Sequence, residues 1–280
     1  MKTIGNNKDL FTLITGASAG LGKELATEFA RRHQNLILVA LPGSNLHHVC
    51  DELTSLFGIK TVSIECDLTN EAALDEMAGY VSKNFSVNQL INNAGMGGTM
   101  RFEEASCEYL DKIIHLNIRA TTMLTRLLLP ELVKHEKAMI INIASMAAFG
   151  PIPYKTIYPA SKAFIYSFSR GLASELRGTG VKVVVVNPGQ INTNPEVTSR
   201  ISCQGFLGRI GLLTASDIAC SAISAAENGA EVVIPGILNK INRRLIRWIP
   251  EMIRLYLLEK IFRRELSIRE IFNTQVMKAA

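Results

Sequence analysis

The sequence predicts an α/β fold, a doubly wound parallel sheet of seven strands with helices on both faces. Short apolar runs rich in β-branched residues alternate with amphipathic stretches of helical length. That alternation is typical of buried parallel strands joined by crossover helices. The expected strands are residues 10–15, 36–40, 61–65, 89–91, 138–143, 181–187 and 231–234. The main expected helices are residues 20–32, 45–57, 71–83, 118–134 and 161–177.

The length of 280 residues suits one large α/β domain with a substantial core. After Pro235 and Gly236 the pattern changes to basic, amphipathic helical segments, so we expect a main domain over 1–236 and a helical extension over 237–280. Residues 240–280 hold ten Lys or Arg and four Asp or Glu, while the whole chain has a net charge of +5. A basic tail on a near-neutral body favours an anionic surface or ligand and argues against nucleic-acid binding.

The cysteines and the first residues of the sequence indicate the cellular compartment in which the protein is expected. The five cysteines are widely spaced and form no C-x-x-C pair, so we expect neither a disulfide framework nor a metal site. The first residues lack an apolar segment of the secretory type, and no run of 18 apolar residues occurs anywhere. We therefore expect a cytoplasmic protein. The cysteines are Cys50, Cys66, Cys107, Cys203 and Cys220.

A glycine-rich turn follows the first expected strand and opens the first expected helix. Residues 15–22 read Thr-Gly-Ala-Ser-Ala-Gly-Leu-Gly. Glycines allow a tight turn and close backbone approach to a pyrophosphate, which then lies at a helix N-terminus. The alternative is an ordinary strand-to-helix turn. The expected contacts of this loop with a dinucleotide are Gly16, Ser18, Ala19, Gly20, Leu21 and Gly22.

The same loop also matches a hydrolase motif. Residues 16–20 fit G-x-S-x-G, with Ser18 in the position of a nucleophile. A serine hydrolase of that type needs a histidine late in the chain, after an acidic residue. The last histidine is His135, well before the final strands, which argues against this interpretation.

Polar residues follow the third and fourth expected strands, where open sheets bind ligands. Asp67 and Leu68 close the third strand, and the Asp67 carboxylate is either an adenine contact or the N-cap of the next helix. Residues 92–95 read Asn-Asn-Ala-Gly at the end of the fourth strand. From this motif we expect Asn93, Ala94 and Gly95 to contact a dinucleotide, although such residues also close turns.

Three residues form a candidate catalytic group. Tyr158 and Lys162 are four residues apart, on one face of an expected helix, and Ser145 follows the fifth strand. A phenol is a poor base near neutral pH, but a nearby ammonium stabilises the phenolate and lowers its pKa. A serine hydroxyl can hold a substrate oxygen, so the group suits proton transfer to an oxygen while hydride moves at carbon. Taken alone, a Tyr–Lys pair on a helix is usually surface packing.

Together these motifs resemble the single-domain short-chain dehydrogenase/reductases, a Rossmann-fold family, over about residues 8–236. The matching features are T-G-x-x-x-G-x-G at 15–22, N-N-A-G at 92–95 and Y-x-x-x-K at 158–162. The resemblance implies Tyr158 as general acid/base, Lys162 as its electrostatic partner and ribose ligand, and Ser145 as the group that orients the carbonyl. It places the family's active-site asparagine at Asn117, which would hold a water that resupplies protons. It also implies cofactor contacts from Pro188, Gly189, Ile191 and Thr193.

The choice between NAD(H) and NADP(H) is weakly marked. Ala40 stands where the similar NAD enzymes carry an acid, and Leu41 stands where many NADP enzymes carry Arg. The other common basic position is Ala19. The missing acid favours NADP(H) slightly over NAD(H), with Ser44 and Asn45 as neutral phosphate contacts.

The substrate region and the extension are apolar. The segment after Asn187 contains Ile191, Val197, Ile201, Phe206 and Leu207, which favour a hydrophobic ketone, and Tyr154 is a second phenol near the pocket. The tail is similar to those of 3-oxoacyl and hydroxysteroid reductases, which implies a 3-oxoacyl, ketosphinganine or steroid substrate.

The extension carries two stripes, and its role has two interpretations. Ile237, Ile241, Leu245 and Trp248 form an apolar stripe, and Lys240, Arg243, Arg244 and Arg247 form a basic one. Either residues 237–264 contact an anionic membrane surface, or the apolar stripe packs on the domain or another subunit. By analogy with the family we expect a homodimer or homotetramer. The other functions that remain open are a non-catalytic dinucleotide sensor or scaffold and a serine hydrolase.

Overall fold

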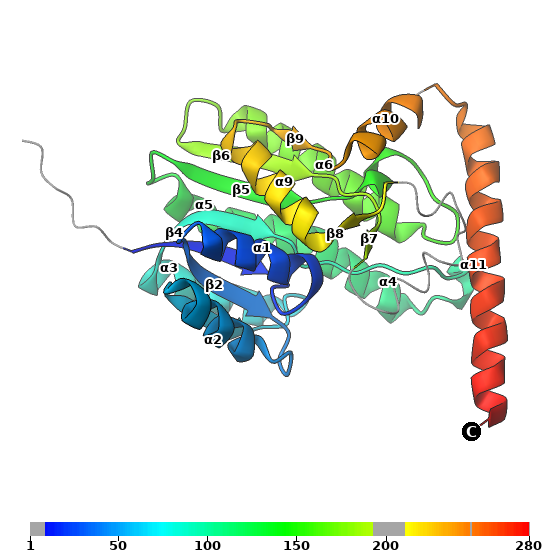
Figure 1. Cartoon of the computed structure of the whole chain (residues 1–280), viewed down its shortest axis with the longest axis horizontal. Helices are drawn as coiled ribbons and strands as arrows, with labels where there is room; N and C mark the ends of the chain where they lie inside the picture. Colours follow the sequence, from blue (N-terminus) through cyan, green and yellow to red (C-terminus); the bar gives the residue numbers. More distant parts are fainter. Residues whose placement is uncertain (1–8, 193–210, 247, 280) are drawn as a thin grey trace, which may run out of the picture.

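The computed structural model of the chain describes residues 9–192, 211–246 and 248–279. Seven parallel strands form one sheet in the order β3-β2-β1-β4-β5-β6-β9, as the sequence predicts (Figure 1). The order reverses between β1 and β4, which opens a crevice at the carboxyl ends of these strands. The strands are β1 (Leu10–Thr15), β2 (Asn35–Ala40), β3 (Thr61–Glu65), β4 (Ser86–Asn92), β5 (Ala138–Ile143), β6 (Val181–Val186) and β9 (Val232–Val233).

Helices cover both faces of this sheet because the strands are apolar on both sides. All six residues of β5 are buried, and β6 is a run of valines interrupted by one lysine. One core cluster joins the sheet to α1, α2 and α9, and a second joins it to α3, α5 and α6. The helices are α1 (Gly20–Arg31), α2 (Leu46–Phe57), α3 (Glu71–Asn84), α4 (Cys107–Ile114), α5 (Thr121–Leu132), α6 (Ile157–Glu175), α9 (Ala215–Glu227), α10 (Ile237–Ile246) and α11 (Glu251–Ala279).

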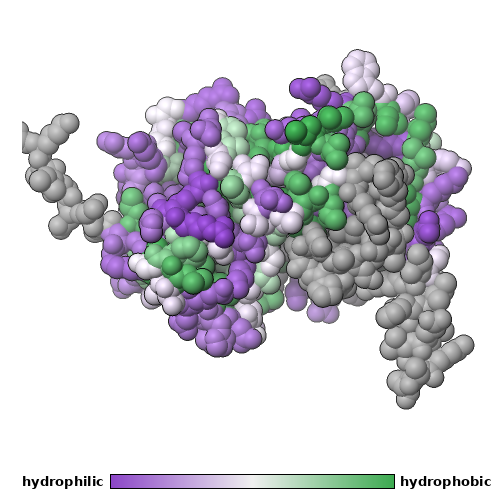
Figure 2. All heavy atoms as spheres, in the orientation of Figure 1, coloured by the Kyte–Doolittle hydropathy of each residue, from purple (hydrophilic) through white to green (hydrophobic). Residues whose placement is uncertain are grey.

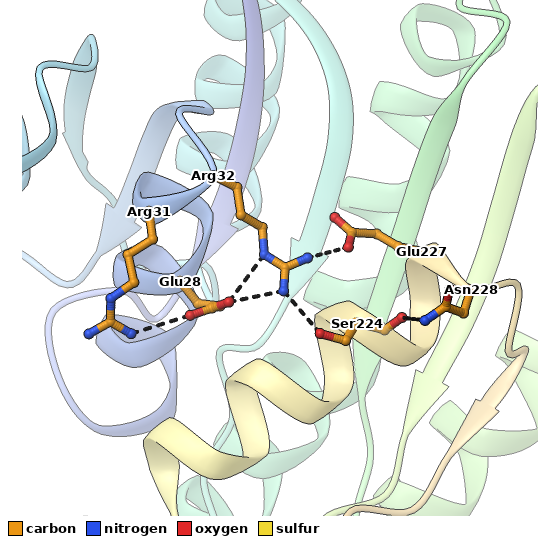
Figure 3. Close-up of polar contacts among 6 residues, drawn as sticks. All are labelled: Glu28, Arg31, Arg32, Ser224, Glu227 and Asn228. Atoms are coloured by element: carbon orange, nitrogen blue, oxygen red, sulfur yellow. Dashed lines mark hydrogen bonds and ion pairs between the residues drawn. The ribbon is translucent and has the colours of Figure 1, made fainter.

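A polar cluster fastens the C-terminal end of α1 to α9 (Figure 3). The Arg32 guanidinium donates to Glu28 Oε1 on its own helix, with Nε–O and Nη2–O distances of 3.1 and 2.9 Å. It also donates to Ser224 Oγ at 3.0 Å and pairs with Glu227. Fully buried alanines of α9 permit this close approach. The cluster holds α9 against the half of the sheet that carries the glycine-rich loop.

Two helix starts differ from the sequence prediction. The helix expected over 118–134 begins at Thr121, because His115–Ala120 form a π-helix that continues from α4. Helix α4 itself was not predicted; the Ser106 hydroxyl caps it by accepting from the N–H of Tyr109 at 3.1 Å. The helix expected over 161–177 begins at Ile157, which places Pro159 in its first turn, where proline is tolerated.

The extension consists of α10 and α11, and α11 runs past the edge of the sheet where the strands end (Figure 1). Glu265 of α11 is buried and accepts a hydrogen bond of 2.7 Å from Thr99 Oγ1, and Phe262 and Leu266 are buried beside it. The inner face of α11 therefore packs on the domain.

The outer faces of α10 and of the start of α11 do not pack on the domain. Ten large apolar side chains remain exposed there, and Figure 2 shows hydrophobic residues gathered over this region. We call them the outer apolar face: Ile237, Leu238, Ile241, Leu245, Trp248, Ile249, Met252, Ile253, Tyr256 and Leu257.

One arginine of the expected basic stripe does not face solvent. The Arg243 guanidinium lies 4.2 Å from the centroid of the Phe149 ring and donates to the Tyr166 hydroxyl at 3.3 Å. It thus ties α10 to η3 (Met146–Phe149), the 3₁₀ turn after β5, and to α6. Among the described helices, none combines the length and apolar character that a membrane span requires.

Candidate active site

A cavity of about 740 Å³ opens at the carboxyl edge of the sheet. Its walls come from the segments that follow β1, β4, β5 and β6, from α6, and from α10 and α11. The structure brings most of the predicted site residues together here. Those that line the cavity are Gly16, Ala19, Gly20, Leu21, Gly22, Asn93, Ala94, Gly95, Ser145, Tyr158, Lys162, Pro188, Gly189 and Ile191.

The glycine-rich turn has the shape that a phosphate cradle requires. Gly16 has φ +65°, and a Cβ on Gly22 would overlap the carbonyl oxygen of Gly16. The N-cap residue of α1 is Ala19, which provides no side-chain cap, and the first turn contains no acidic residue. The first N–H groups and the positive end of the helix dipole are thus left for an anionic ligand. These features fit the pyrophosphate of a dinucleotide.

Thr15 and Asn93 lock the loops after β1 and β4 to each other. Thr15 Oγ1 accepts hydrogen bonds of 3.0 Å from the N–H groups of both Asn93 and Ala94. Asn93 Nδ2 donates to the carbonyl oxygens of Thr15 at 2.9 Å and Gly16 at 3.2 Å. The Asn93 side chain therefore holds the backbone of the glycine turn in place through two hydrogen bonds. A buried amide, Asn92, extends this polar network by donating to Asn142 at 2.8 Å.

The predicted contacts for the adenosine end lie outside the cavity lining. Asp67 Oδ1 accepts from the N–H of Thr69 at 2.9 Å and from its hydroxyl at 2.7 Å. The Thr69 hydroxyl bond, above all, lowers the pKa of Asp67. Asn70, not Asp67, caps α3, accepting from Ala73 N–H at 3.1 Å, so the N-cap alternative for Asp67 is wrong. Leu68, beside Asp67, is buried.

The turn after β2 is bonded to the end of β3. The carbonyl of Ala40 accepts from Cys66 N–H at 2.8 Å, and Gly43 N–H donates to Glu65 Oε1 at 3.2 Å. The hydroxyl of Ser44 is buried without a hydrogen-bond partner, and Asn45 has a left-handed backbone, φ 54°. The residues predicted for this region do not include Glu65. Its place at the end of the strand that pairs with β2 was the available signal.

Tyr158 and Ser145 meet in the cavity. Their side chains are hydrogen-bonded, and the Ser145 hydroxyl also accepts from Ala147 N–H at 3.1 Å. The Tyr158 ring packs so closely on the loop after β4 that a Cβ on Gly97 would overlap it. Burial raises the pKa of the Tyr158 phenol, and the bond to Ser145 opposes that rise. The protonated phenol is therefore the dominant form at neutral pH.

Lys162 lies one helical turn after Tyr158 and is 5% exposed. Its Nζ donates to the carbonyl of Ile143 at 2.8 Å and lies 5.9 Å from the centroid of the Tyr158 ring. Burial lowers the pKa of Lys162 to about 8. The Tyr–Lys spacing in the sequence predicts that the ammonium lowers the phenol pKa. In the structure burial dominates at both groups, so the tyrosine pKa is raised instead.

Asn117 is buried in the π-helix beneath this pair. Its Oδ1 accepts from Met96 N–H at 2.9 Å, and its Nδ2 donates to the Met96 carbonyl at 2.9 Å and to Ser161 Oγ at 2.9 Å. Ser161 Oγ in turn donates to the carbonyl of Tyr158 at 2.8 Å. The side chain of Asn117 thus joins the loop after β4 to the first turn of α6.

Some predicted residues lie apart from this group. Ser18 does not line the cavity, and no described lining residue is a histidine, which further weakens the hydrolase interpretation. Tyr154, with φ 63°, lies outside the lining, and its hydroxyl accepts from Arg263 at 3.5 Å. Thr193 lies outside the described residues, as do Val197, Ile201, Phe206 and Leu207.

The extension supplies a wall of the cavity that the sequence motifs do not indicate. Asn239 is buried; its Nδ2 donates to the carbonyls of Gly211 at 3.0 Å and Pro235 at 2.9 Å. A Cβ on Gly189 would lie 2.7 Å from that amide, so α10 adjoins the loop after β6. The lining residues from the extension are Asn239, Asn242, Ile246, Arg254, Leu258, Ile261 and Phe262.

Comparison with known proteins gives consistent matches. The sequence model of the short chain dehydrogenase family matches residues 11–202. A very-long-chain 3-oxoacyl-CoA reductase of Anas platyrhynchos is 31% identical over 205 residues, which cover 71% of this chain but only 65% of that protein. The ketoacyl reductase HetN of a Nostoc species is 31% identical over 224 residues, 79% of this chain and 77% of that protein.

A solved structure matches as well. The short-chain dehydrogenase of Sphingobium yanoikuyae in complex with NADPH is 29% identical, with a TM-score of 0.73 over 86% of this chain and 96% of that one.

Proposed function

Because the chain belongs to the short-chain dehydrogenase family of oxidoreductases, we propose that it reduces a hydrophobic ketone with a nicotinamide dinucleotide. The family match confirms the resemblance that the glycine-rich turn, the Asn-Asn-Ala-Gly segment and the Tyr–Lys pair predicted. The observation that carries the proposal is the junction of two features in one cavity. The hydrogen-bonded Tyr158–Ser145 pair lines the same space as the uncapped N-terminus of α1.

The proposed chemistry at the protein side is proton transfer. The Ser145 hydroxyl holds the substrate carbonyl oxygen next to the Tyr158 hydroxyl. Tyr158 donates its proton to that oxygen, and its raised pKa keeps the proton available at neutral pH. The Lys162 ammonium then stabilises the phenolate that remains, which requires that lysine be protonated. Asn117 contributes as a positioning residue, because its amide holds both the loop after β4 and the start of α6.

The cofactor proposal follows from the cradle. The N-terminal turn of α1 and the glycines at 16, 20 and 22 would hold the pyrophosphate, and Asp67 would accept from the adenine amino group. When bound, the nicotinamide supplies or accepts the hydride. We favour NADP(H) slightly over NAD(H), because Ala40 provides no carboxylate for a ribose hydroxyl and Glu65 is already bonded to Gly43. Parallel titrations with NADPH and NADH test this preference.

The proposed substrate is a lipid-like ketone. Ile246, Leu258, Ile261 and Phe262 form an apolar wall of the cavity, and the two similar curated proteins are by name reductases of 3-oxoacyl or ketoacyl compounds. An apolar wall of this kind stabilises a hydrocarbon chain by removing it from water.

A membrane surface is the proposed source of that substrate. The outer apolar face lies on the same two helices as the apolar wall, and the exposed cations Lys240, Arg244 and Lys260 accompany it. Apolar side chains with adjacent cations are typical of helices that lie on anionic lipid. We also propose a cytoplasmic homodimer or homotetramer that pairs through α5 and α6, where Met123, Leu127 and Phe164 are exposed. Light scattering measures that assembly.

The central test is the Tyr158→Phe variant, with NADPH oxidation measured against medium-chain ketones. Loss of the phenolic hydroxyl removes the proton donor, so we expect kcat to fall about 10²- to 10⁴-fold. Dinucleotide affinity, followed by cofactor fluorescence, stays within about 2-fold, because the substitution leaves the glycine turn and the uncapped N-terminus of α1 unchanged. Equal weak turnover by wild type and variant across many ketones would instead support the sensor or scaffold function. Labelling of Ser18 by a fluorophosphonate would support the hydrolase.

A further inference from the structure

The cavity contains positive charge and no negative charge among the residues described. Its lining includes three cations, Lys155, Lys162 and Arg254, and no aspartate or glutamate. Lys162 belongs to the proton-transfer group, and Lys155 Nζ lies 4.8 Å from the centroid of the Phe262 ring. The mechanism gives no task to Arg254, which lies in the first turn of α11, while the other α11 residues of the lining, Leu258, Ile261 and Phe262, are apolar.

The Arg254 guanidinium is built into the cavity wall. The side chain is 15% exposed, and its Nε is buried without a hydrogen-bond partner. Arg254 Nη2 forms an ion pair with Glu251 Oε2 on the same helix, at 3.3 Å. The side chain of that glutamate is mostly exposed. An arginine offers five donors, and a buried donor without a partner is unfavourable. The guanidinium therefore retains donors for an acceptor inside the cavity.

The protein makes room for this group at Gly150. A Cβ there would lie 2.6 Å from Arg254 Cζ, so the guanidinium lies directly against the backbone of Gly150. Gly150 directly follows the 3₁₀ turn that starts after Ser145. At a rise of about 2 Å per residue, this turn separates Gly150 from Ser145 by on the order of 10 Å. The cation thus lies at a fixed distance from the proposed position of the reacting carbonyl.

We propose that Arg254 binds an anionic group of the substrate, so that the substrate is an apolar ketone with a carboxylate or phosphate at one end. This inference rests on the proposed function and narrows its substrate class. It favours an oxo acid or an acyl thioester whose carrier contains phosphate. It disfavours a ketone with an ammonium group, which Arg254 would repel, and gives no advantage to a neutral steroid.

The experiment compares three forms of one oxo fatty acid: the free acid, its methyl ester and its coenzyme A thioester. A charge-assisted hydrogen bond of the usual strength predicts that Arg254→Met lowers kcat/KM roughly 10- to 100-fold for the anionic form that Arg254 binds. The ester changes less than about 3-fold, since the methionine keeps the apolar contacts. Arg254→Lys retains part of the preference, and Arg264→Met, an exposed arginine on the same helix, retains all of it.

The acid and thioester arms distinguish a bound carboxylate from a bound phosphate. The inference is overturned if wild type turns over acid, ester and thioester equally well, or if Arg254→Met weakens all three alike. Calorimetric binding of an unreactive saturated carboxylate, measured against its methyl ester, separates this inference from the proposed function. Arg254-dependent carboxylate binding without any ketone turnover would support the anion site and contradict the reductase.

Discussion

The two sides of the cavity are built in different ways. On the dinucleotide side the walls are backbone: short turns directly after buried strands, locked by the reciprocal bonds of Thr15 and Asn93. On the side proposed to hold the substrate, the walls are side chains of α10 and α11, helices that lie outside the sheet and are fastened by Asn239 and by the Thr99–Glu265 bond. A local sequence motif therefore specifies the dinucleotide side. The other side depends on which faces of α10 and α11 pack against the domain.

The largest expected effect concerns the Ser145–Tyr158–Lys162 group, which lies between the two sides of the cavity. Lys162→Met removes the charge that stabilises the phenolate, so we expect kcat to fall about 10²- to 10⁴-fold at pH 7. In wild type the rate of reduction should decline as pH rises through about 8, where Lys162 loses its proton. A steady-state pH profile with one saturating ketone measures both. A rate that stays flat from pH 7 to pH 9 would contradict the role given to Lys162.

The same variant separates activity from stability. The folded-state pKa of Lys162 is about 8 and its ordinary value 10.5, so between these values the unfolded chain binds a proton that the folded chain does not. The free energy of unfolding of wild type therefore rises with pH across this window, by up to about 3 kcal/mol relative to Lys162→Met. Urea unfolding of both proteins at pH 8 and pH 10 measures the difference. If the two pH dependences coincide, the lysine is not buried as described.

A smaller effect tests the backbone side alone. In Gly22→Ala the added methyl group overlaps the Gly16 carbonyl and displaces the turn, which we expect to destabilise the fold by about 1–3 kcal/mol. Dinucleotide binding should weaken at least about 10-fold, since the N–H groups of the cradle move. Binding of the saturated carboxylate should persist. Gly79→Ala, on an open face of α3, is the matched control and should leave both ligands unaffected.

These contrasts show how much of the molecule the sequence predicts. Short aliphatic or β-branched runs marked all seven strands, and a glycine turn with two asparagines marked the cradle, because these features depend on neighbours in the chain. The π-helix at 115–120 left no signal in the sequence, and the hydrogen bonds of Asn117 within it go to Met96 and Ser161, which are distant along the chain. Helix α6 begins at Ile157, four residues before the predicted start at 161. The proline after Tyr158 is compatible either with the end of a preceding segment or with the first turn of a helix, so the sequence did not determine the start.

The extension was harder to predict because it is apolar on two faces. The pattern around Leu245 and Trp248 indicated one stripe, but those residues are exposed and Ile246, between them in sequence, lines the cavity. In the sequence, Arg254 is not distinguished from the other cations of the extension, which are expected to be exposed to solvent. Only the folded chain shows it against Gly150, because no local rule links residue 254 to residue 150.

The smallest expected effect concerns the outer apolar face. Trp248 is the only tryptophan of the chain and is 86% exposed, so its emission should shift to the blue when anionic vesicles are added. The double variant Leu245→Ser with Met252→Ser should weaken vesicle binding roughly 10-fold while stability changes by less than about 0.5 kcal/mol. Leu56→Ser, an exposed leucine on α2, is the control. Unshifted emission with a doubled molar mass would indicate a second copy on this face instead.

The pairing of β7 (Ile191–Asn192) with β8 (Leu213–Thr214) places residue 191 opposite 213 and residue 192 opposite 214. Asn239 fastens the same junction through the carbonyl of Gly211. The described residues on either side of this junction, 192 and 211, are thus held close to one point, and loop-closure entropy changes slowly with the number of residues enclosed. Changes in the number of residues between 192 and 211 should therefore alter the free energy of unfolding only slightly, while the sheet and the cavity keep their arrangement.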